Sequence, residues 1–383
     1  MDRESSLAIT KRLIEHVVAD TTDLADAPMV EPAEIFLDRD RWEREREQFF
    51  FDTPQVIGFA GEVAAPGSFM TAEVMGVPVV VVRDEDNTLR AFLNVCSHRG
   101  ARVATGCGKR KRLVCGFHGW SYELNGKLAG RGRAEAFEPE VSNPSLQPLP
   151  VSDRAGLIVV GLRPGMGPLR VEHALDDIAS ALLGHGLEQM TLVGSDRFEV
   201  AANWKLVVNL SHEGYHFSTL HRDSLAPLMT GHGVVDEFGI HTRWAFPLRG
   251  IESLRDKDEA DWPDFPRAAV NHTLFPGTVV VANEGNAQMI RVEPGEHPGS
   301  SVVYFSSVSE VLGSEVSGDA EENEISEAAL AIYEFGRNIF ASEDLPISEQ
   351  CQRGIEASGR PVIIGRNEPV VQMWQRRWSE ELE

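Results

Sequence analysis

Hydrophobic positions near the start of the chain recur with the spacing of a helix. Between residues 5 and 26 these positions are Leu7, Ile9, Leu13, Ile14, Val17 and Val18. An apolar stripe of this kind covers one face of an amphipathic helix. The pattern therefore predicts an N-terminal helical segment, residues 1–45, that packs on another part of the protein through that stripe.

From residue 54 the pattern changes to short β-rich runs. Apolar and β-branched residues dominate 55–59, 68–74, 78–82 and 89–95, and turn-forming residues separate these runs at 65–67, 75–76 and 84–87. Short strands joined by such turns are typical of an antiparallel β domain. A proline-rich stretch at 144–150 and a strand at 157–160 mark its end, so residues 46–160 are expected to form this domain.

The remainder of the chain, residues 161–383, mixes helical and strand patterns. Helical spacing occupies 178–187, 204–220 and 321–340, whereas 198–202, 239–246, 277–282, 288–292 and 301–309 have the character of strands. Strands grouped between helices favour an α+β domain over alternating βαβ units. The sequence has no internal repeat and no glycine-rich dinucleotide fingerprint after a strand.

Composition narrows the class of protein. The 383 residues are 42% hydrophobic and 25% charged, which is ordinary for a globular protein with two domains. A net charge of −23 argues against nucleic acid or an anionic membrane as a partner, and no apolar run predicts a membrane span. Of the four cysteines, two belong to the Cys/His pairs that could bind a metal, so the chain has no disulfide framework and a reducing, cytoplasmic location is predicted. The acidic stretches 314–327 and 380–383 are interpreted as a solvated loop and tail.

Two mixed Cys/His pairs carry the clearest chemical signal. The chain contains Cys96-Ser-His98 and, after sixteen intervening residues, Cys115-Gly-Phe-His118. Mixed pairs suit a two-iron cluster with two cysteines on one iron and two histidines on the other. A structural zinc site is the alternative, although zinc fingers usually place both cysteines before both histidines. The remaining cysteines are interpreted as ordinary loop or packing thiols: Cys107 and Cys351.

A second group of polar side chains lies within residues 203–221. On a helix, Asn209, Glu213 and His216 fall at i, i+4 and i+7 and form one stripe. His221 lies roughly 140° around an ideal helix from His216, so the helix must bend or end for both rings to reach one metal. Two histidines and a carboxylate form the facial triad of non-haem Fe(II) oxygenases. An exposed polar face, or histidines satisfied within a core, is the alternative.

The residues around the Cys/His pairs add a family resemblance. Asn94-Val-Cys96-Ser-His98-Arg-Gly100 and Cys115-Gly-Phe-His118-Gly-Trp-Ser-Tyr122 resemble the two cluster loops of Rieske proteins, in particular those of ring-hydroxylating oxygenase α subunits. The resemblance implies that a Rieske [2Fe-2S] cluster is bound by Cys96, His98, Cys115 and His118. It also implies that the Trp and Tyr after the second pair pack against this cluster.

The second polar group resembles the mononuclear-iron motif of the same family, which has Asn-Trp-Lys followed by Glu-Gly-Tyr-His-x4-His. The resemblance implies that His216 and His221 bind the iron. Glu213 matches the acidic residue that joins the cluster of one subunit to the iron of its neighbour, a position more often occupied by Asp. Asn209 matches an Asn near the iron.

The third iron ligand implied by the resemblance is an acidic residue close to the C terminus. Asp344 fits that pattern best, and Glu343 is its rival. Asp344 also precedes Leu345-Pro346, so it could instead cap the following helix.

These features together imply an α+β protein of defined organisation. An antiparallel β Rieske domain would be followed by a catalytic domain with a curved antiparallel sheet covered by helices, on which the N-terminal segment packs. The implied function is that of a terminal oxygenase, which hydroxylates, dihydroxylates or oxidatively dealkylates a small organic substrate with O2. Electrons from NAD(P)H would arrive through a separate reductase, with or without a ferredoxin, and the chain would work as a homotrimer.

The substrate is less well defined by the sequence. An aromatic or other cyclic substrate is expected, and a quaternary amine such as carnitine or betaine is the alternative, because glutamate at position 213 resembles members that attack such amines. A pure Rieske electron carrier would leave more than half of the chain unexplained. Pocket residues are expected within 224–246 and 272–290, with four candidate aromatic residues: Phe238, Trp244, Phe246 and Phe275. Basic residues at 109–112 could meet an acidic electron donor, or could simply form a solvated loop.

Overall fold

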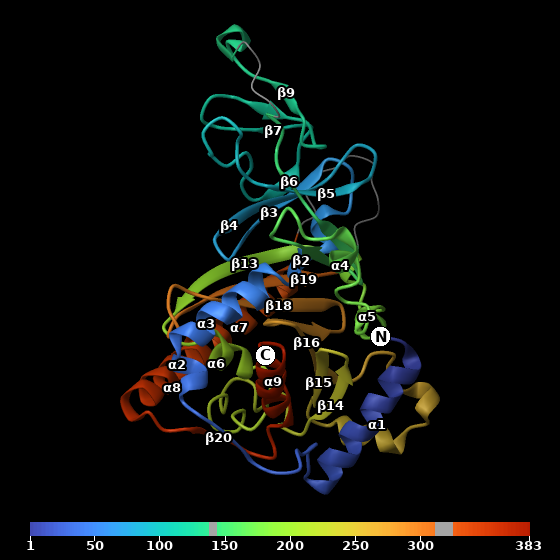
Figure 1. The fold of residues 1–383 in the computed structure, drawn as a ribbon. Helices are drawn as coiled ribbons and strands as arrows, with labels where there is room; N and C mark the ends of the chain where they lie inside the picture. The colour runs from blue at the N-terminus through green and yellow to red at the C-terminus, as the bar shows by residue number, and fades with distance from the viewer. Residues whose placement is uncertain (138–143, 311–324) are drawn as a thin grey trace. The chain divides into compact units, whose positions relative to one another are not determined.

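The computed structural model describes residues 1–137, 144–310 and 325–383. Within these residues the chain forms two compact units (Figure 1). The larger unit comprises Met1–Phe49, Asp176–Gly186 and Thr191–Glu383, and the smaller unit comprises Phe50–Leu175 and Leu187–Met190.

The smaller unit consists of three antiparallel sheets. A five-stranded sheet has the order β10-β5-β4-β3-β6, and two three-stranded sheets have the orders β11-β12-β2 and β7-β8-β9. The strands are β2 (Gln55–Phe59), β3 (Ser68–Val74), β4 (Val77–Arg83), β5 (Leu89–Leu93), β6 (Cys107–Lys109), β7 (Leu113–Val114), β8 (Ser121–Tyr122), β9 (Leu128–Gly130), β10 (Pro148–Leu149), β11 (Val151–Arg154) and β12 (Leu157–Val160). A short helix, α4 (Pro168–Glu172), follows them. The five β runs read from the sequence of this region are confirmed as strands.

Strand β4 explains why this part of the sequence is so rich in valine. Val79 and Val81 belong to one core cluster, whereas Val80 and Val82 belong to another. Successive side chains of a strand point to opposite faces of the sheet, so a strand that is buried on both faces carries a continuous apolar run. The second of these clusters also holds the buried Cys96 and Cys115.

The larger unit is built on a seven-stranded antiparallel sheet in the order β13-β19-β18-β17-β16-β15-β14. Its strands are β13 (Thr191–Val200), β14 (Val234–Phe238), β15 (His241–Pro247), β16 (Ala268–Leu274), β17 (Thr278–Asn283), β18 (Asn286–Pro294) and β19 (Ser301–Ser309). Strand β16 was not predicted from the sequence, because the polar residues Asn271 and His272 interrupt its apolar run. Every residue of the strand is nevertheless buried.

Helices and one small sheet complete the larger unit. The helices are α1 (Arg3–Ala19), α2 (Glu34–Leu37), α3 (Arg39–Glu45), α5 (Ala179–Leu182), α6 (Trp204–Asn209), α7 (Glu327–Ile339), α8 (Leu345–Ser358) and α9 (Pro369–Glu380). Strand β1 (Met29–Glu31) pairs with β20 (Val362–Ile364). No helix among the residues described combines the length and the apolar character needed to cross a membrane.

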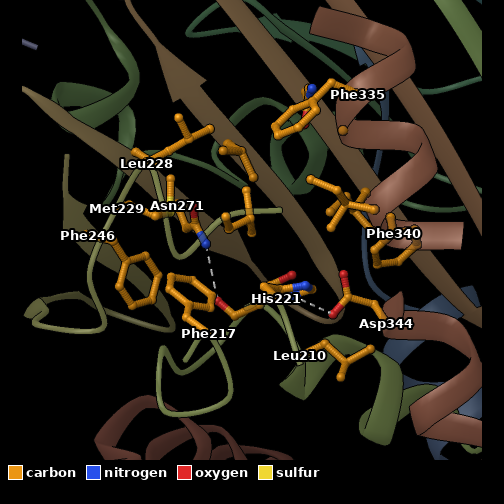
Figure 2. A pocket seen from close by; sticks show the side chains of 18 of the residues that line it. Leu210, Phe217, His221, Leu228, Met229, Phe246, Asn271, Phe335, Phe340 and Asp344 are labelled. Atoms are coloured by element: carbon orange, nitrogen blue, oxygen red, sulfur yellow. Dashed lines mark hydrogen bonds and ion pairs between the residues drawn. The ribbon is translucent and has the colours of Figure 1, made fainter. Parts of the chain in front are cut away.

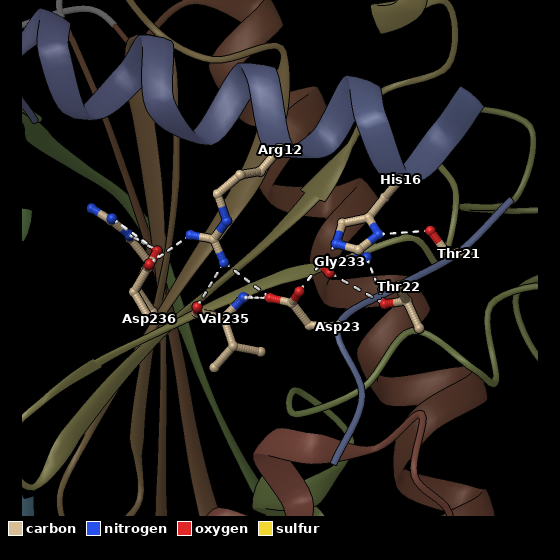
Figure 3. A network of polar contacts seen from close by, with 9 residues as sticks. Arg12, His16, Thr21, Thr22, Asp23, Gly233, Val235 and Asp236 are labelled. Atoms are coloured by element: carbon tan, nitrogen blue, oxygen red, sulfur yellow. Dashed lines mark hydrogen bonds and ion pairs between the residues drawn. The ribbon is translucent and has the colours of Figure 1, made fainter. Parts of the chain in front are cut away.

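Helix α1 packs on strands β14 and β15 through the predicted apolar stripe. Ile9, Leu13 and Ile14 are buried in one cluster with residues of those strands. A polar network extends the contact (Figure 3): the Arg12 guanidinium donates to Asp236 at 2.6 Å and to Asp23 at 3.0 Å. The N-terminal segment is thereby fixed to the edge of the large sheet.

Helix α6 is anchored by buried polar contacts to helix α3. Glu45 of α3 accepts hydrogen bonds from both Trp204 Nε1, at 3.0 Å, and Lys205 Nζ. Burial lowers the pKa of Lys205 to about 8, although the charge of Glu45 opposes this shift. Trp204 also packs edge-on against Trp378 of α9 at 4.8 Å between ring centroids. The Asn-Trp-Lys motif therefore fixes the start of the segment that continues to His216.

Three helical predictions need correction or restriction. The helix predicted over 204–220 ends at Asn209, and the chain continues in irregular turns to residue 220. Within these turns Gly214 passes so close to Phe246 that a Cβ there would meet its ring at 2.7 Å. The helix predicted over 178–187 shrinks to α5, since Gly184 and Gly186 adopt positive φ values of 88° and 69°. In the block predicted over 321–340, residues 321–324 lie outside the described residues.

Candidate metal centres

The two mixed Cys/His pairs lie in two loops at the ends of strands β5 and β7. The thiols of Cys96 and Cys115 are free and buried, with 3% and 2% of each residue exposed. The imidazoles of His98 and His118 lie closer to the surface, and their ring centroids are 4.6 Å apart. Buried thiolates paired with more exposed imidazoles match the donor set of a [2Fe-2S] cluster of the Rieske type.

The two loops share one backbone geometry. Cys96 N donates to Ala101 O at 2.8 Å, and Gly100 N donates back to Cys96 O at 2.9 Å. In the second loop Cys115 N donates to the carbonyl of Trp120, and Gly119 N donates to the carbonyl of Cys115. Gly100 and Gly119 have φ values of +81° and +70°, a conformation that favours glycine. The glycines after each pair are thus required by the turn.

Aromatic side chains close over these loops. Trp120 stacks on His98 with 5.0 Å between centroids, and Tyr122 Oη lies 3.2 Å from Cys96 Sγ. Ser97 N donates to the same Tyr122 oxygen at 3.0 Å. Burial and the nearby Cys96 thiol raise the pKa of Tyr122 to about 12, so the phenol stays protonated.

The other cysteines and the basic stretch near these loops are exposed. Residues 109–112 are exposed, but Arg112 is 3.5 Å from Glu123 and Arg110 lies over the ring of Phe69. Cys107 lies exposed on β6 and Cys351 lies exposed on α8. The packing role predicted for Cys351 is therefore wrong: the residue falls on the outer face of a helix that is buried on one side only.

A second set of metal-binding side chains converges in the larger unit. One ligand atom from each of His216, His221 and Asp344 can be chosen so that all three lie within 4.8 Å of one another. His221 Nε2 is 3.2 Å from Asp344 Oδ1, and His216 Nε2 is 3.9 Å from the same oxygen. Both histidines lie in the irregular turns after α6, so the end of that helix allows the two rings to converge.

Two further carboxylates orient these histidines. Glu213 Oε1 contacts His216 Nδ1, and Glu343 Oε2 lies 2.8 Å from His221 Nδ1. A carboxylate at Nδ1 holds the proton there and leaves the Nε2 lone pair free to bind a metal. Burial lowers the pKa of His221, but Asp344 and Glu343 outweigh burial and raise it.

The geometry separates the roles open to Asp344 and Glu343. Both lie in a π-helical turn (η7, Phe340–Asp344) that leads into α8. Asp344 faces the Nε2 atoms, whereas Glu343 accepts hydrogen bonds from His221 Nδ1 and from Ser224 Oγ at 2.9 Å. The side chain of Asp344 makes no capping hydrogen bond to α8. Its carboxylate is thus available to a metal, and the capping alternative is wrong.

Asn209 does not contact this group in the structure. Its Oδ1 lies 3.3 Å from Nδ1 of His212, whose ring stacks on Trp374 at 5.4 Å between centroids. His212 is fully buried, and this burial lowers its pKa to about 3, so the ring is neutral. The sequence stripe of Asn209, Glu213 and His216 is broken because the helix ends at Asn209.

A cavity of about 590 Å³ lies next to His216, His221 and Asp344 (Figure 2). Its walls come from one face of the large sheet, from α7 and from residues 210–229. The apolar lining comprises Leu210, Phe217, Leu225, Leu228, Met229, Phe246, Leu248, Ala269, Val281, Ile290, Phe305, Ala331, Ile332, Phe335, Ile339 and Phe340. The polar lining away from the three possible ligands comprises Ser211, Glu213, Asn271, Asn283 and Gln288.

Both predicted ranges contribute to this cavity, but most of the predicted aromatic residues do not. Phe246 lines it, whereas Trp244 packs behind Phe246 at 5.0 Å between centroids. Phe238 and Phe275 are outside the lining. The aromatic rings that replace them come from segments distant in sequence, such as Phe335 on α7, which no local pattern relates to the iron motif.

Comparison with known proteins identifies the two units. Residues 53–141 match the family model of the Rieske [2Fe-2S] domain, and residues 187–383 match the catalytic domain of the ring hydroxylating alpha subunit. The oxygenase subunit of carnitine monooxygenase from Acinetobacter pittii (strain PHEA-2) is 26% identical over 358 residues, which cover 90% of each protein. The oxygenase subunit of glycine betaine monooxygenase from Pseudomonas aeruginosa (strain UCBPP-PA14) is 28% identical over 239 residues, 62% of this chain and 55% of that protein.

Solved structures agree with the sequence comparison on the fold. A quaternary ammonium Rieske monooxygenase, described for carnitine oxidation and inter-subunit electron transfer, superposes with a TM-score of 0.74 at 22% identity, covering 94% of this chain and 96% of that one. The match to the Rieske [2Fe-2S] family model excludes the zinc alternative, and the match to the catalytic domain agrees with a mononuclear iron at His216, His221 and Asp344. The chain belongs to the ring hydroxylating alpha subunit family and is an oxidoreductase of the Rieske oxygenase type.

Proposed function

We propose that this chain is the terminal component of a Rieske monooxygenase system and acts on a quaternary ammonium compound. The observation that carries the proposal is the position of His216, His221 and Asp344 beside a phenylalanine-rich cavity. Two histidines and one carboxylate leave coordination positions open on a non-haem iron. A pure electron carrier would need neither this group nor the cavity.

Each metal group would be held by its own set of side chains. Cys96, His98, Cys115 and His118 would bind the [2Fe-2S] cluster, and His216, His221 and Asp344 would bind the iron. The cluster would supply single electrons and the iron would activate O2. The chain itself orients the iron histidines through Glu213 and Glu343, and its apolar cavity walls keep water away from the reacting carbon.

The reaction would insert one oxygen atom into a C–H bond. The second oxygen atom of O2 would leave as water, with two electrons from a reductase and two protons completing the balance. When the attacked carbon is bonded to nitrogen, the hydroxylated product can release the amine by C–N cleavage. Neither unit shows a flavin- or nicotinamide-binding motif in the sequence, so the reductase would be a separate protein.

A ring of subunits would connect the two metal centres. The solved quaternary ammonium monooxygenase is described for inter-subunit electron transfer, and this chain has a glutamate, Glu213, on the outer nitrogen of His216. The second carboxylate oxygen of Glu213 accepts a hydrogen bond from the backbone N–H of His216, at 3.1 Å. We propose that it also meets a cluster histidine of a neighbouring copy in a homotrimer.

The relatives support one of the two substrate classes raised by the sequence. Both named relatives act on quaternary amines, carnitine and glycine betaine, which favours that class over the aromatic substrate expected first. Phenylalanine faces can hold a methylated ammonium group by cation–π attraction. The apolar lining alone equally suits a neutral ring compound, so an aromatic substrate is the second candidate.

O2 uptake with a reductase tests this proposal. The purified protein would be supplied with NADH, a Rieske-oxygenase reductase and a panel of N-methylated and aromatic compounds. We expect O2 uptake and product formation with an N-methylated compound, and loss of both in Asp344→Ala. Turnover confined to aromatic compounds would favour the second candidate.

A further inference from the structure

Among the described residues that line it, the cavity has no lysine or arginine to pair with a carboxylate. Among its described lining residues the only charged side chains, apart from histidine, are Glu213 and Asp344. The segments 138–143 and 311–324, which the structure does not describe, contain no Lys, Arg or His in their sequence. The missing cation therefore cannot come from those segments of the chain.

Three arginines that neighbour the lining in sequence make contacts outside it. Arg337 Nε donates to Asp196 at 2.7 Å, and Arg249 Nε donates to the carbonyl of Ala226 at 2.6 Å. Arg291 follows the lining residue Ile290 on β18, so its side chain points to the other face of the sheet, where it pairs with Glu293. These contacts keep the three guanidinium groups out of the lining.

The charges around the two histidines favour a cation. Three carboxylates surround the two histidines: those of Glu213, Glu343 and Asp344. Their combined negative charge is larger than the positive charge that a divalent iron would supply. An anionic group beside them would have no lysine or arginine partner among the described lining residues, and burying such a charge is costly in a region of low dielectric constant. A cationic group meets phenylalanine faces there instead.

The entrance of the cavity is apolar as well. Three lining side chains are well exposed: Leu228 by 49%, Phe335 by 44% and Ile332 by 38%. Figure 2 shows Phe335 projecting from α7 and Leu228 lying across from it. The cavity volume of about 590 Å³ lies within the range of ~300–1,000 Å³ typical of sites for drug-sized ligands. There is thus room, and an apolar path, for a hydrocarbon tail.

We infer that the substrate is a quaternary ammonium compound with an apolar tail and no carboxylate group. This inference rests on the proposed function and narrows it, because carnitine and glycine betaine both carry a carboxylate. The ammonium group would lie near the phenylalanines next to the iron ligands. The tail would extend between the sheet and α7 toward Phe335.

Equilibrium dialysis of the full-length protein with four probes tests the inference without relying on turnover. The probes are phenyltrimethylammonium, its neutral isostere tert-butylbenzene, L-carnitine and glycine betaine. We expect phenyltrimethylammonium to bind at least ~100-fold more tightly than either carboxylated amine, the scale of leaving a buried charge unpaired. It should also bind ~10-fold more tightly than tert-butylbenzene.

The outcomes separate this inference from the proposed function. Tighter binding of carnitine or betaine than of phenyltrimethylammonium overturns the inference and leaves a quaternary-amine monooxygenase in place. Equal or tighter binding of tert-butylbenzene removes the preference for a cation and overturns both.

An engineered cation provides an independent test. Ile332→Arg would place a guanidinium at the exposed entrance, and we expect carnitine to bind ~10-fold more tightly to it, as for a charged hydrogen bond. Leu330→Arg is the matched control, because Leu330 is similarly exposed on α7 but outside the lining. An unchanged affinity for carnitine in Ile332→Arg, or an equal gain in Leu330→Arg, contradicts the inference.

Discussion

Asp344 and Glu343 are adjacent acids with different predicted contributions to iron binding. Asp344 Oδ1 faces both Nε2 atoms, whereas Glu343 contacts only the outer nitrogen of His221. Removing an outer carboxylate of this kind typically costs 10–100-fold in metal affinity. For Glu343→Ala we therefore expect about 1.4–2.8 kcal/mol of lost binding free energy.

Asp344→Ala should cost more, because it removes a ligand atom and leaves only two histidines. We expect iron affinity to fall at least ~1,000-fold, beyond the range for an outer partner. Ser224→Ala is a finer control, since it removes one hydrogen bond to Glu343, about 1 kcal/mol or fivefold in affinity.

The assay is iron retained per chain during dialysis against graded concentrations of a chelator, with the visible spectrum as a measure of the cluster. Iron loss should be greatest in Asp344→Ala, smaller in Glu343→Ala, smaller again in Ser224→Ala and smallest in the unchanged protein. The cluster spectrum should be the same in all four, because its ligands lie in the other unit. Greater loss in Glu343→Ala than in Asp344→Ala would refute the assignment of the ligand.

Three further predictions follow from the contacts described above. His98→Ala or His118→Ala should abolish the cluster spectrum and leave the mononuclear iron, which spectroscopy with iron analysis will detect; an intact spectrum would contradict the assigned ligands. Glu213→Gln should keep both centres loaded yet slow reoxidation of the reduced cluster by O2, measured by stopped flow, and an unchanged rate would exclude a bridging role. The pKa of His212 is about 3 in the folded protein and about 6.5 in the unfolded chain. Between these two pH values the unfolded state binds more protons than the folded state, so the free energy of unfolding falls as the pH falls. Urea unfolding should show that the free energy of unfolding falls by up to about 2 kcal/mol less between pH 6.5 and 5 in His212→Phe than in the unchanged protein. His297→Gln, at an exposed position, should behave like the unchanged protein. The same pH dependence in His212→Phe and the unchanged protein would contradict this prediction.

The smaller unit was predictable from sequence because its signals are local. Strand lengths follow from alternating or continuous apolar runs bounded by turn residues, as in β2 and β3. The cluster loops combine ligand and glycine within a few residues, as in Cys96-Ser-His98-Arg-Gly100, so one short stretch contains most of the geometry.

The geometry around His216, His221 and Asp344 depends on contacts between distant parts of the chain. Such contacts produce no local pattern in the sequence. Helical spacing predicted that Asn209, Glu213 and His216 share a face, but the helix ends at Asn209 and the chain then packs through Gly214 against Phe246. The positions of Glu343 and Asp344 relative to His221 arise from a π-helical turn that has no periodic pattern in sequence. The lining of the cavity is set by how α7 lies against β18, where Gly336 allows the approach to Gln288.

Iron and acid-labile sulfide analysis of the purified protein tests the central claim most directly. A chain with a Rieske cluster and a separate mononuclear site should contain about three irons and about two sulfides. Zinc without sulfide would contradict both centres, and about two irons with two sulfides would reduce the chain to an electron carrier.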